Sequence, residues 1–541
     1  MTKELLRHRA IGDSRKGGSE MSLLVSNGVI NSRGSEKAWP PLRTGHLRER
    51  LATVMFRGLA WSAPVLAGIT PIRTAVMRWY EDMMCAGYQN SVRTNPSRAA
   101  IEADRLAIGI AILHSIERAL AEKRLGATTL RRMFNTLVYN VLIRQGERGA
   151  KERFRAVYGC HPPDFLVISP GKACNLRCKG CYADSGPAPE KLDWATFERV
   201  MREAHDLWGA RFFVFSGGEP LAYRDNGRGV LDMAEKYLDS FFLMYTNGTL
   251  ITDEVARRLG ALGNFTPAIS VEGLEERTDE RRGPGVFKRV IAAMERLRRE
   301  GVLFGLSLTA TRENAEELFA DEVIDFYFEK MGALYAWIFH YMPIGRAFTL
   351  ELMPTPEQRV WMWKRMWQLV RERHLVIADF WNSGTASSGC VSAGRPGGYL
   401  YIDWNGAVSP CVFVPYSPIN IHDAYAQGKT LNDVWSEPFF ARIRAWQQAY
   451  GFKEYGIERD LSDQKQPGNW LMPCPIRDHH AEFYRLLMEC EPEPTDENAA
   501  AALMDPSYHE GLAKFDRELA ALMDPIWESL YVSPNTSQEN S

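Results

Sequence analysis

Between residues 164 and 345, short apolar runs of β-forming residues alternate with longer amphipathic stretches. The runs are FLVIS (165–169), RFFVFS (211–216), FFLMYT (241–246), PAISVE (267–272), LFGLSLTA (303–310) and YAWIFHYM (335–342). Strands that alternate with helices build βα units around a parallel sheet. The order of the elements leaves two alternatives open, an open sheet and a partial barrel.

Three of the nine cysteines follow the first predicted strand directly, in the segment CNLRCKGC. Cys174, Cys178 and Cys181 form a C-x3-C-x2-C array at the carboxyl end of that strand, where parallel α/β proteins carry their chemistry. Neighbouring thiolates repel one another unless a cation neutralises them. Because this loop supplies three ligands, a four-iron cluster bound there keeps one iron open. A structural zinc site and unliganded buried cysteines are the alternatives.

Polar motifs end the later strands. In SGGEPL, Gly217 and Gly218 allow a ligand close to the backbone, and the Glu219 carboxylate suits an ammonium group. In SVEG, Ser270 and Glu272 alternate to one face and suit a ribose diol.

An arginine follows these motifs at the start of RGPG. Arg282 suits bidentate pairing with a carboxylate, and Arg281 is the alternative in register. Ser307 and Thr309 share one face of the fifth strand and lie within reach of the same ligand. Three residues around the end of the sixth strand fit either a substrate contact or a structural role: His340, Tyr341 and Arg346.

In this order on successive strands, the motifs resemble the radical SAM superfamily over roughly residues 162–345. The resemblance implies a partial (β/α)6 TIM-like barrel. It also implies a [4Fe–4S] cluster on Cys174, Cys178 and Cys181 whose open iron binds S-adenosylmethionine. Gly217, Gly218 and Glu219 would then hold the amino group of the methionine part, and Arg282 its carboxylate. The family usually has an aromatic residue just before the last cysteine that contacts adenine. This chain has Gly180 there and Tyr182 just after it, so Tyr182 is the expected aromatic contact with the cofactor.

A second set of cysteines, Cys390, Cys411 and Cys474, lies beyond the predicted barrel. The spacing C-x15-G-x4-C resembles the SPASM/Twitch auxiliary-cluster domain, and Asn405-Gly406 predicts a type I′ hairpin turn between two of the thiols. The full SPASM pattern continues C-x2-C-x5-C-x3-C, but here Arg477 stands at the second cysteine. We therefore expect one auxiliary [4Fe–4S] cluster, or a site that merely staples the domain. Its fourth ligand stays open among Cys490, Asp478, His479, His480 and no protein ligand.

The predicted organisation has six parts. They are a flexible segment (1–45), a helical domain (46–160), the core barrel (161–345), a helical linker (346–385), the auxiliary-cluster domain (386–490) and an acidic helical tail (491–541). We expect both chain ends to be solvated and partly flexible. The apolar segment 56–73 is read either as a helix buried against the barrel or as a peripheral membrane contact that admits a lipid.

Charge and hydropathy exclude several classes of function. A net charge of −2 gives no basic field for nucleic acid, and the longest uncharged apolar run, 58–72, is shorter than the ~20 residues that cross a bilayer. The first residues lack the apolar core of a signal peptide, so we expect a cytoplasmic protein with reduced thiols.

The resemblance predicts an enzyme that cleaves S-adenosylmethionine reductively, with an electron from a donor such as ferredoxin or flavodoxin. The resulting 5′-deoxyadenosyl radical would take hydrogen from an unactivated C–H bond of a peptide, a protein or another natural product. A lipid or isoprenoid substrate is the alternative. A non-catalytic iron–sulfur carrier or a metal-stabilised scaffold is the competing class, and it would leave the motifs at Gly217–Glu219, Ser270, Glu272 and Arg282 as coincidences.

Overall fold

A ten-stranded sheet organises the part of the chain that the computed structural model describes, residues 69–451 and 468–532. Its strands pair in the order β11-β9-β8-β1-β2-β3-β4-β5-β6-β7, and β1 to β7 are parallel to their neighbours. The predicted runs became β1 (Phe165–Ile168), β2 (Phe212–Phe215), β3 (Phe241–Thr246), β4 (Phe265–Val271), β5 (Gly305–Ala310) and β6 (Ala336–His340). The unpredicted β7 (Ile377–Asp379) extends the edge beyond β6. The βα architecture of a partial (β/α)6 barrel is confirmed.

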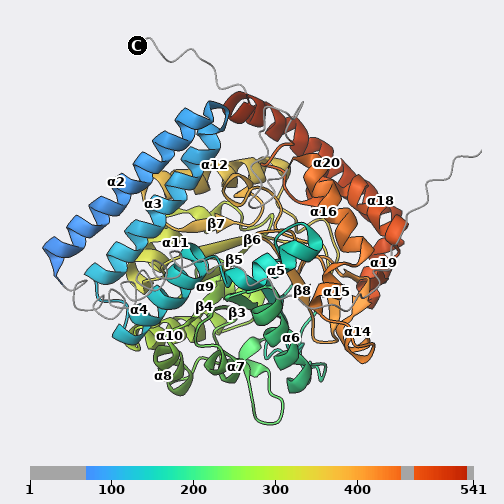
Figure 1. Ribbon diagram of the computed structural model, residues 1–541, viewed down its shortest axis with the longest axis horizontal. Helices are drawn as coiled ribbons and strands as arrows, with labels where there is room; N and C mark the ends of the chain where they lie inside the picture. Colours follow the sequence, from blue (N-terminus) through green and yellow to red (C-terminus); the bar gives the residue numbers. More distant parts are fainter. Residues whose placement is uncertain (1–68, 452–467, 533–541) are drawn as a thin grey trace, which may run out of the picture. The chain divides into compact units, whose positions relative to one another are not determined.

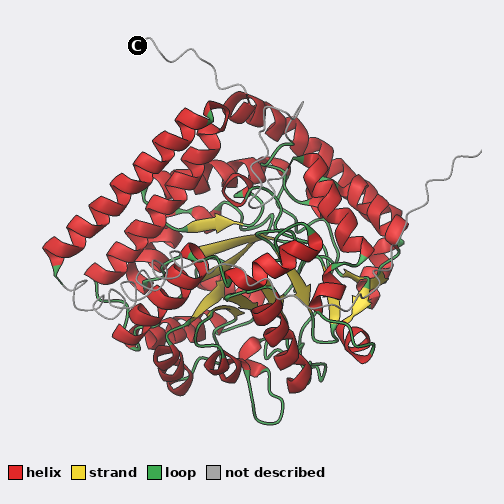
Figure 2. Cartoon of the chain, in the orientation of Figure 1, coloured by secondary structure: helices red, strands yellow, loops and turns green. Residues whose placement is uncertain are grey.

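Helices join the parallel strands and cover the sheet (Figure 2). They are α6 (Trp194–Leu207), α7 (Val230–Lys236), α8 (Asp253–Leu262), α9 (Glu275–Arg282), α10 (Val286–Arg299), α11 (Asp321–Ile324) and α12 (Pro356–Glu372). In α6 the Asp193 side chain caps the first turn by accepting from the Thr196 backbone N–H. Phe197, Val200 and Ala204, at helical spacing, are buried, so one face of α6 packs inward.

The helical region before the barrel contains α2 (Thr70–Thr94), α3 (Ala99–Ala121), α4 (Ala127–Met133), a π-helical turn (Phe134–Ile143) and α5 (Arg148–Tyr158). Figure 1 shows α2 and α3 side by side. Asp104 of α3 is buried and links three other segments. It accepts from Thr385 at 2.7 Å and from Tyr531 at 2.8 Å, and it pairs with Arg371 of α12. These bonds fasten the helical region to the rest of the chain.

The apolar segment 56–73 is described only from residue 69. Residues 56–68 and the predicted flexible segment 1–45 lie outside the described residues. Ile69 is 43% exposed and Ile72 is 39% exposed, and no residue of α2 is buried. A helix buried against the barrel is therefore wrong for residues 69–73, because no residue of α2 is buried and α2 packs chiefly on α3. No helix in the described ranges is long and apolar enough to cross a bilayer.

The predicted hairpin is present as β8 (Tyr399–Ile402) and β9 (Ala407–Ser409), but its turn differs from the prediction. Gly406 has φ +82°, whereas Asn405 is not among the residues with positive φ, so the turn is not type I′. Instead, the Asp403 carboxylate accepts from the backbone N–H groups of Asn405 and Ala407 at 2.8 and 2.9 Å. β8 also pairs in parallel with β1, so the hairpin continues the barrel sheet.

The chain ends in small strands and packed helices. They are α13 (Gly384–Ser387), β10 (Tyr416–Ser417), β11 (Ile419–Asn420), α14 (Ile421–Ala426), α15 (Leu431–Trp435), α16 (Pro438–Tyr450), α17 (Pro475–Asp478), α18 (His480–Cys490), β12 (Glu493–Pro494), α19 (Glu497–Leu503) and α20 (Pro506–Trp527). α20 buries Leu512, Leu519 and Met523 and contacts α12, α17 and α18. A solvated tail is therefore wrong for this helix. Residues 533–541 lie outside the described part.

Candidate active site

The three cysteines of CNLRCKGC, called the triplet below, line one cavity at the carboxyl end of the barrel strands. This barrel cavity has a volume of about 210 Å³. Arg346 fastens the loop that carries the triplet: its Nη1 donates to the Cys178 carbonyl at 2.6 Å, and its Nε donates to Asp184 at 2.9 Å. Arg346 was expected to have either a substrate contact or a structural role, and these bonds give it the structural role.

The chemistry of the triplet fits an iron–sulfur cluster. Burial raises the pKa of Cys174 to about 11, with contributions from Glu219 and the other two thiols, so a cation must offset the charge when these sulfurs are ionised. Among the described residues, no group of three or more His, Cys, Asp or Glu side chains is arranged to hold a metal ion.

The two glycines of SGGEPL bring the end of β2 against the strand that leads into the triplet. The backbone N–H groups of Gly218 and Glu219 donate to the carbonyls of Gly171 and Ala173 at 3.0 and 2.8 Å. A Cβ atom on Gly218 would lie 2.2 Å from the Ala173 oxygen. Only glycine allows this approach, and both Gly217 and Gly218 line the cavity.

Glu219 is not among the residues that line the cavity. Its buried carboxylate accepts from the Thr246 hydroxyl at 2.7 Å and from the backbone N–H groups of Leu221 and Asn247 at 3.1 and 2.8 Å. These bonds link the ends of β2 and β3, and the contact of Glu219 with an ammonium group stays a prediction. Burial outweighs these bonds and raises the pKa of Glu219. Thr246 and Asn247 line the cavity in its place.

Ser270, Ser307 and Thr309 line the cavity, with Ser270 and Ser307 paired across β4 and β5. Glu272, just past the end of β4, is not among the residues that line the cavity. Its Oε1 atom accepts from Arg281 at 2.5 Å and from the Nε of Arg282 at 2.9 Å, so its carboxylate holds both arginines. Its contact with a ribose stays a prediction.

Both arginines line the cavity together with the triplet. Burial opposes the charge on Arg282, but Glu272, Cys178 and Cys181 outweigh it, so the pKa of this guanidinium is raised. The Ser185 hydroxyl, also in the cavity wall, is buried and has no hydrogen-bond partner among the described residues. The cavity thus presents an unsatisfied hydroxyl and fixed cations to a bound polar molecule.

The missing aromatic residue before the last cysteine is replaced in space by another ring. Gly180 has φ +63°, and a Cβ atom there would lie 2.6 Å from Cε2 of Tyr341. Tyr341 follows β6 and lines the cavity. Tyr182 also lines it, but its hydroxyl bonds Ser216 at 2.7 Å and accepts from Gly217 at 3.3 Å. The sequence pattern did not identify Tyr341 as the ring beside Gly180, since the two residues are far apart in the chain.

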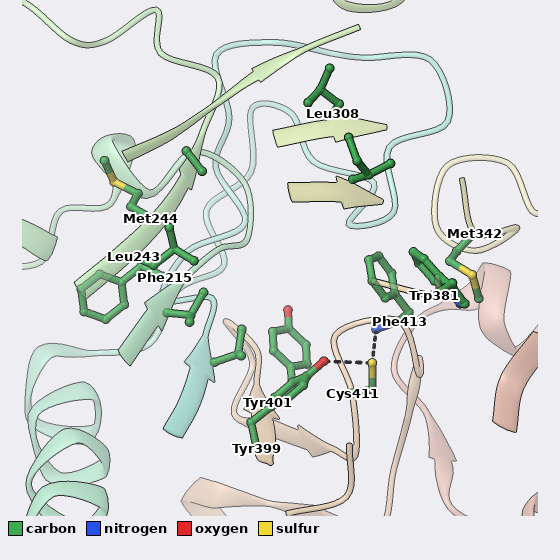
Figure 3. Close-up of a cluster of buried hydrophobic side chains, with 14 of the residues drawn as sticks. Phe215, Leu243, Met244, Leu308, Met342, Trp381, Tyr399, Tyr401, Cys411 and Phe413 are labelled. Carbon is green, nitrogen blue, oxygen red and sulfur yellow. Dashed lines mark hydrogen bonds between the residues drawn. The ribbon is translucent and has the colours of Figure 1, made fainter. Parts of the chain in front are cut away.

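The second set, called the auxiliary cysteines below, lies beside the barrel cavity. Figure 3 shows the Cys411 sulfur between the Tyr399 hydroxyl, at 3.0 Å, and the Phe413 backbone nitrogen, at 3.5 Å. Burial raises the pKa of Cys411 to about 12 and also raises that of Cys474, to which the charges of Cys390 and Cys411 contribute. Each of the three thiols thus lies within electrostatic reach of the others.

The side chains proposed as a fourth ligand are mostly engaged elsewhere. Asp478 accepts from Arg359 through both oxygens and from the Cys474 backbone N–H at 3.0 Å. His479 bonds the Met472 carbonyl, and His480 bonds the Ile476 carbonyl and His509. Cys490, the last residue of α18, lies near the charge of Arg442. None of them donates to or accepts from an auxiliary thiol.

The comparisons with known proteins come from sequence and from structure. The model of the radical SAM superfamily matches residues 168–320, and that of the iron–sulfur cluster-binding domain SPASM matches residues 390–456. Mycofactocin maturase MftC of Mycobacterium ulcerans is 30% identical over 54% of this chain and 80% of its own length. AdoMet-dependent heme synthase of Nitratidesulfovibrio vulgaris is 27% identical over 56% of this chain and 84% of its own length. The solved structure of SuiB of Streptococcus suis bound to S-adenosylmethionine has a TM-score of 0.46 and 20% sequence identity. The match covers 59% of this chain and 78% of SuiB.

The chain belongs to the radical SAM superfamily and carries a SPASM iron–sulfur domain. It is an enzyme that depends on S-adenosylmethionine. Its iron–sulfur cofactors are a [4Fe–4S] cluster at the radical SAM domain and auxiliary iron–sulfur clusters at the SPASM domain.

Proposed function

We propose that this enzyme removes a hydrogen atom from an unactivated C–H bond of a peptide or protein side chain that enters the barrel cavity. The observation that carries this proposal is the cavity itself, which runs from the triplet to Phe413, next to Cys411. Two curated relatives, mycofactocin maturase and the sporulation killing factor maturation protein SkfB of Bacillus subtilis, support maturation chemistry.

The triplet would hold the [4Fe–4S] cluster. With S-adenosylmethionine bound and an electron from a donor such as ferredoxin or flavodoxin, the cluster held by the triplet would supply the reductive chemistry that cleaves the cofactor. The backbone at Gly217 and Gly218, together with Ser270, Ser307 and Thr309, would bind the polar parts of the nucleotide, and Arg282 would pair with its carboxylate. Tyr341, beside Gly180, would take over the aromatic contact with adenine. The auxiliary cysteines would hold one further cluster within the proposed domain 386–490.

The substrate group that enters the cavity is expected to be uncharged. Arg281 and Arg282, both held by Glu272, are the charged side chains in the described cavity wall. His340 also lines it, but burial lowers its pKa to about 4 and keeps it neutral at physiological pH. The opposite wall consists of rings that exclude water, among them Phe339, Phe380 and Phe413.

A lipid or isoprenoid substrate is the second candidate, and α2 favours it. Ile72, Val76, Trp79 and Met83 form an exposed apolar row at helical spacing, and Trp79 is 59% exposed. Such a row suits contact with a membrane surface from the cytoplasmic side. The competing class of non-catalytic carriers does not account for an enzyme family or for the polar cavity next to the triplet.

The test uses the full-length protein reconstituted under anaerobic conditions. With dithionite and S-adenosylmethionine it should release 5′-deoxyadenosine, and the Arg282→Lys variant should release much less. Comparison of peptides and lipids from wild-type and deletion strains then identifies the class of substrate. Peptides changed by loss of hydrogen support the first candidate, whereas copurified lipid and altered lipids support the second. Absence of 5′-deoxyadenosine would refute both.

A further inference from the structure

Arg477 is fully buried next to Cys474, at the position where the full SPASM pattern has a cysteine. Its Nη2 bonds the Nδ1 atom of His340 at 2.9 Å. Its Nε and Nη1 atoms have no hydrogen-bond partner among the described residues. The guanidinium lies over the ring of Trp381, 4.8 Å from the ring centroid, and 5.3 Å from that of Phe515.

The nearby carboxylates do not supply the missing partner. Asp478 is held by Arg359 and by the Cys474 backbone, and it lies 3.6 Å from the Nε of Arg477, beyond hydrogen-bond distance. Asp379 accepts from His340 at 2.9 Å and from the Asn382 side chain at 2.9 Å. A buried guanidinium with unused donors costs free energy unless an anion lies beside it.

Of the auxiliary cysteines, Cys474 acts electrostatically on Arg477, in addition to the carboxylates of Asp478 and Asp379. The charges of Arg477, Cys390 and Cys411 all act on Cys474. Thiolates that ligate a cluster, together with its sulfides, accept hydrogen bonds, and such bonds and nearby charge set the reduction potential. The Nε and Nη1 atoms of Arg477 thus match the thiolates and sulfides of such a cluster, which are anionic and accept hydrogen bonds.

We propose that Arg477 donates its unused N–H groups to the auxiliary cluster and raises the reduction potential of that cluster. This inference rests on the ligand assignment in the proposed function. Reduction adds one electron to the oxidised cluster, taken from dithionite in the test, and no covalent bond forms or breaks. Arg477 stabilises the added negative charge, and it replaces a cysteine ligand with a fixed counter-ion.

His340 is the positioning residue for this guanidinium. Because an arginine can only donate, the Nδ1 atom of His340 accepts from Arg477, and its Nε2–H donates to Asp379. Both ring nitrogens are therefore engaged, so His340 does not act as a base toward the substrate. Its ring lines the barrel cavity, and it links the cavity wall to Arg477 through one hydrogen bond.

The experiment isolates the auxiliary cluster in a full-length protein whose triplet cysteines are changed to alanine. Redox titration followed by EPR gives the midpoint potential in the presence of native Arg477, Arg477→Met or Arg477→Lys. We expect the methionine variant to hold a tenfold lower ratio of reduced to oxidised cluster at a fixed potential, equivalent to ~59 mV for a one-electron couple. The lysine variant should shift less, because it keeps the charge.

Arg444→Met is the matched control, because Arg444 also lies over a tryptophan ring, that of Trp435, but donates to the Ala393 and Trp435 carbonyls. Its potential should equal that of the parent protein. An unchanged potential in Arg477→Met would overturn the proposal. If that variant loses iron, retention of the cluster by Arg477→Lys supports the proposal and loss from both overturns it. No cluster in the parent would instead refute the ligand assignment of the proposed function.

Discussion

The ring of Tyr341 lies where a side chain on Gly180 would begin, because a Cβ atom at residue 180 would come within 2.6 Å of the tyrosine Cε2. The positive φ of Gly180 lets the loop of the triplet pass this ring, and the Tyr341 hydroxyl is held by the Ala347 carbonyl. In the family the aromatic ring comes from the cysteine loop. Here the ring of Tyr341, at the end of β6, lies at that loop instead.

This relationship predicts that Tyr341→Ala weakens binding of S-adenosylmethionine. Stacking of a base on an aromatic ring is worth about 1–3 kcal/mol, so the dissociation constant should rise roughly tenfold to a hundredfold. Tyr341→Phe keeps the ring and should bind nearly as well as the wild type. Titration of the reconstituted protein, followed by the change in its EPR signal, measures the affinity. Equal affinity in the alanine and phenylalanine variants would remove Tyr341 from the site.

The glycine pair at the end of β2 gives a second prediction. Gly218→Ala places a methyl group 2.2 Å from the Ala173 oxygen, which must shift together with the backbone that leads to Cys174. We expect this variant to hold much less iron after reconstitution and to bind S-adenosylmethionine poorly. Gly186→Ala, in the loop between β1 and α6 that also carries the triplet, is the control, because its Cβ atom would meet no atom within 4 Å. Iron content equal to that of the control would argue against this packing.

The local patterns of the chain determined the strands well. The run 241–246 coincides with β3, and the other five predicted strands overlap their observed positions, because strands buried on both faces read as continuous apolar runs. The pairing of β8 with β1 was not predictable, since it joins residues far apart in the chain whose own patterns only indicate strands. The same holds for β7, whose three residues carry too little periodicity.

The chemistry of the candidate site was predictable by residue type, but the orientation of its carboxylates was not. Spacing placed the triplet, Ser270, Ser307 and Thr309 on one cavity. It also suggested that Glu219 and Glu272 bind ligand, whereas both carboxylates bond neighbouring parts of the chain. Nothing local distinguishes a carboxylate that faces a ligand from one that caps the next strand or pairs with an arginine on the following helix.

Glu272 provides a stability prediction, because its single carboxylate pairs with two arginines at a buried position. Glu272→Gln should leave both cations without their anion and lower the free energy of unfolding by about 3–5 kcal/mol. Glu317→Gln removes the partner of Arg277 in an exposed pair and should cost less than about 1 kcal/mol. Denaturant unfolding of the two variants measures the difference. Similar losses in both would contradict the assigned role of Glu272.

The two cysteine sets should load independently. Replacing the triplet by alanine should reduce iron and sulfide content by about half and abolish the spectral response to S-adenosylmethionine. Replacing the auxiliary cysteines should also remove about half of the iron but keep that response. Chemical analysis and EPR of the reconstituted proteins distinguish the two cases. A triplet variant without any iron would contradict a second site, and a variant with full iron content would contradict the first.

His480 gives the protein a stability that depends on pH. Burial in the packing of α18 against α20 lowers its pKa to about 4, and the charge of His509 lowers it further, whereas the hydrogen bond from Nδ1 to the Ile476 carbonyl opposes the shift. An unfolded histidine binds a proton near pH 6.5, so between about pH 6.5 and 4 the unfolded chain holds more protons than the folded one. The contribution of His480 is therefore complete above pH 6.5 and is lost as the pH falls.

The His480→Phe variant lacks this titration. The difference in free energy of unfolding between wild type and variant should shrink by about 2 kcal/mol from pH 7 to pH 5, which follows from 1.36 kcal/mol per pKa unit. Comparing the two proteins cancels the titration of groups that they share. Denaturant unfolding under anaerobic conditions at both pH values gives the two differences. A gap of constant size would mean that His480 is protonated as readily in the folded protein as in the unfolded chain.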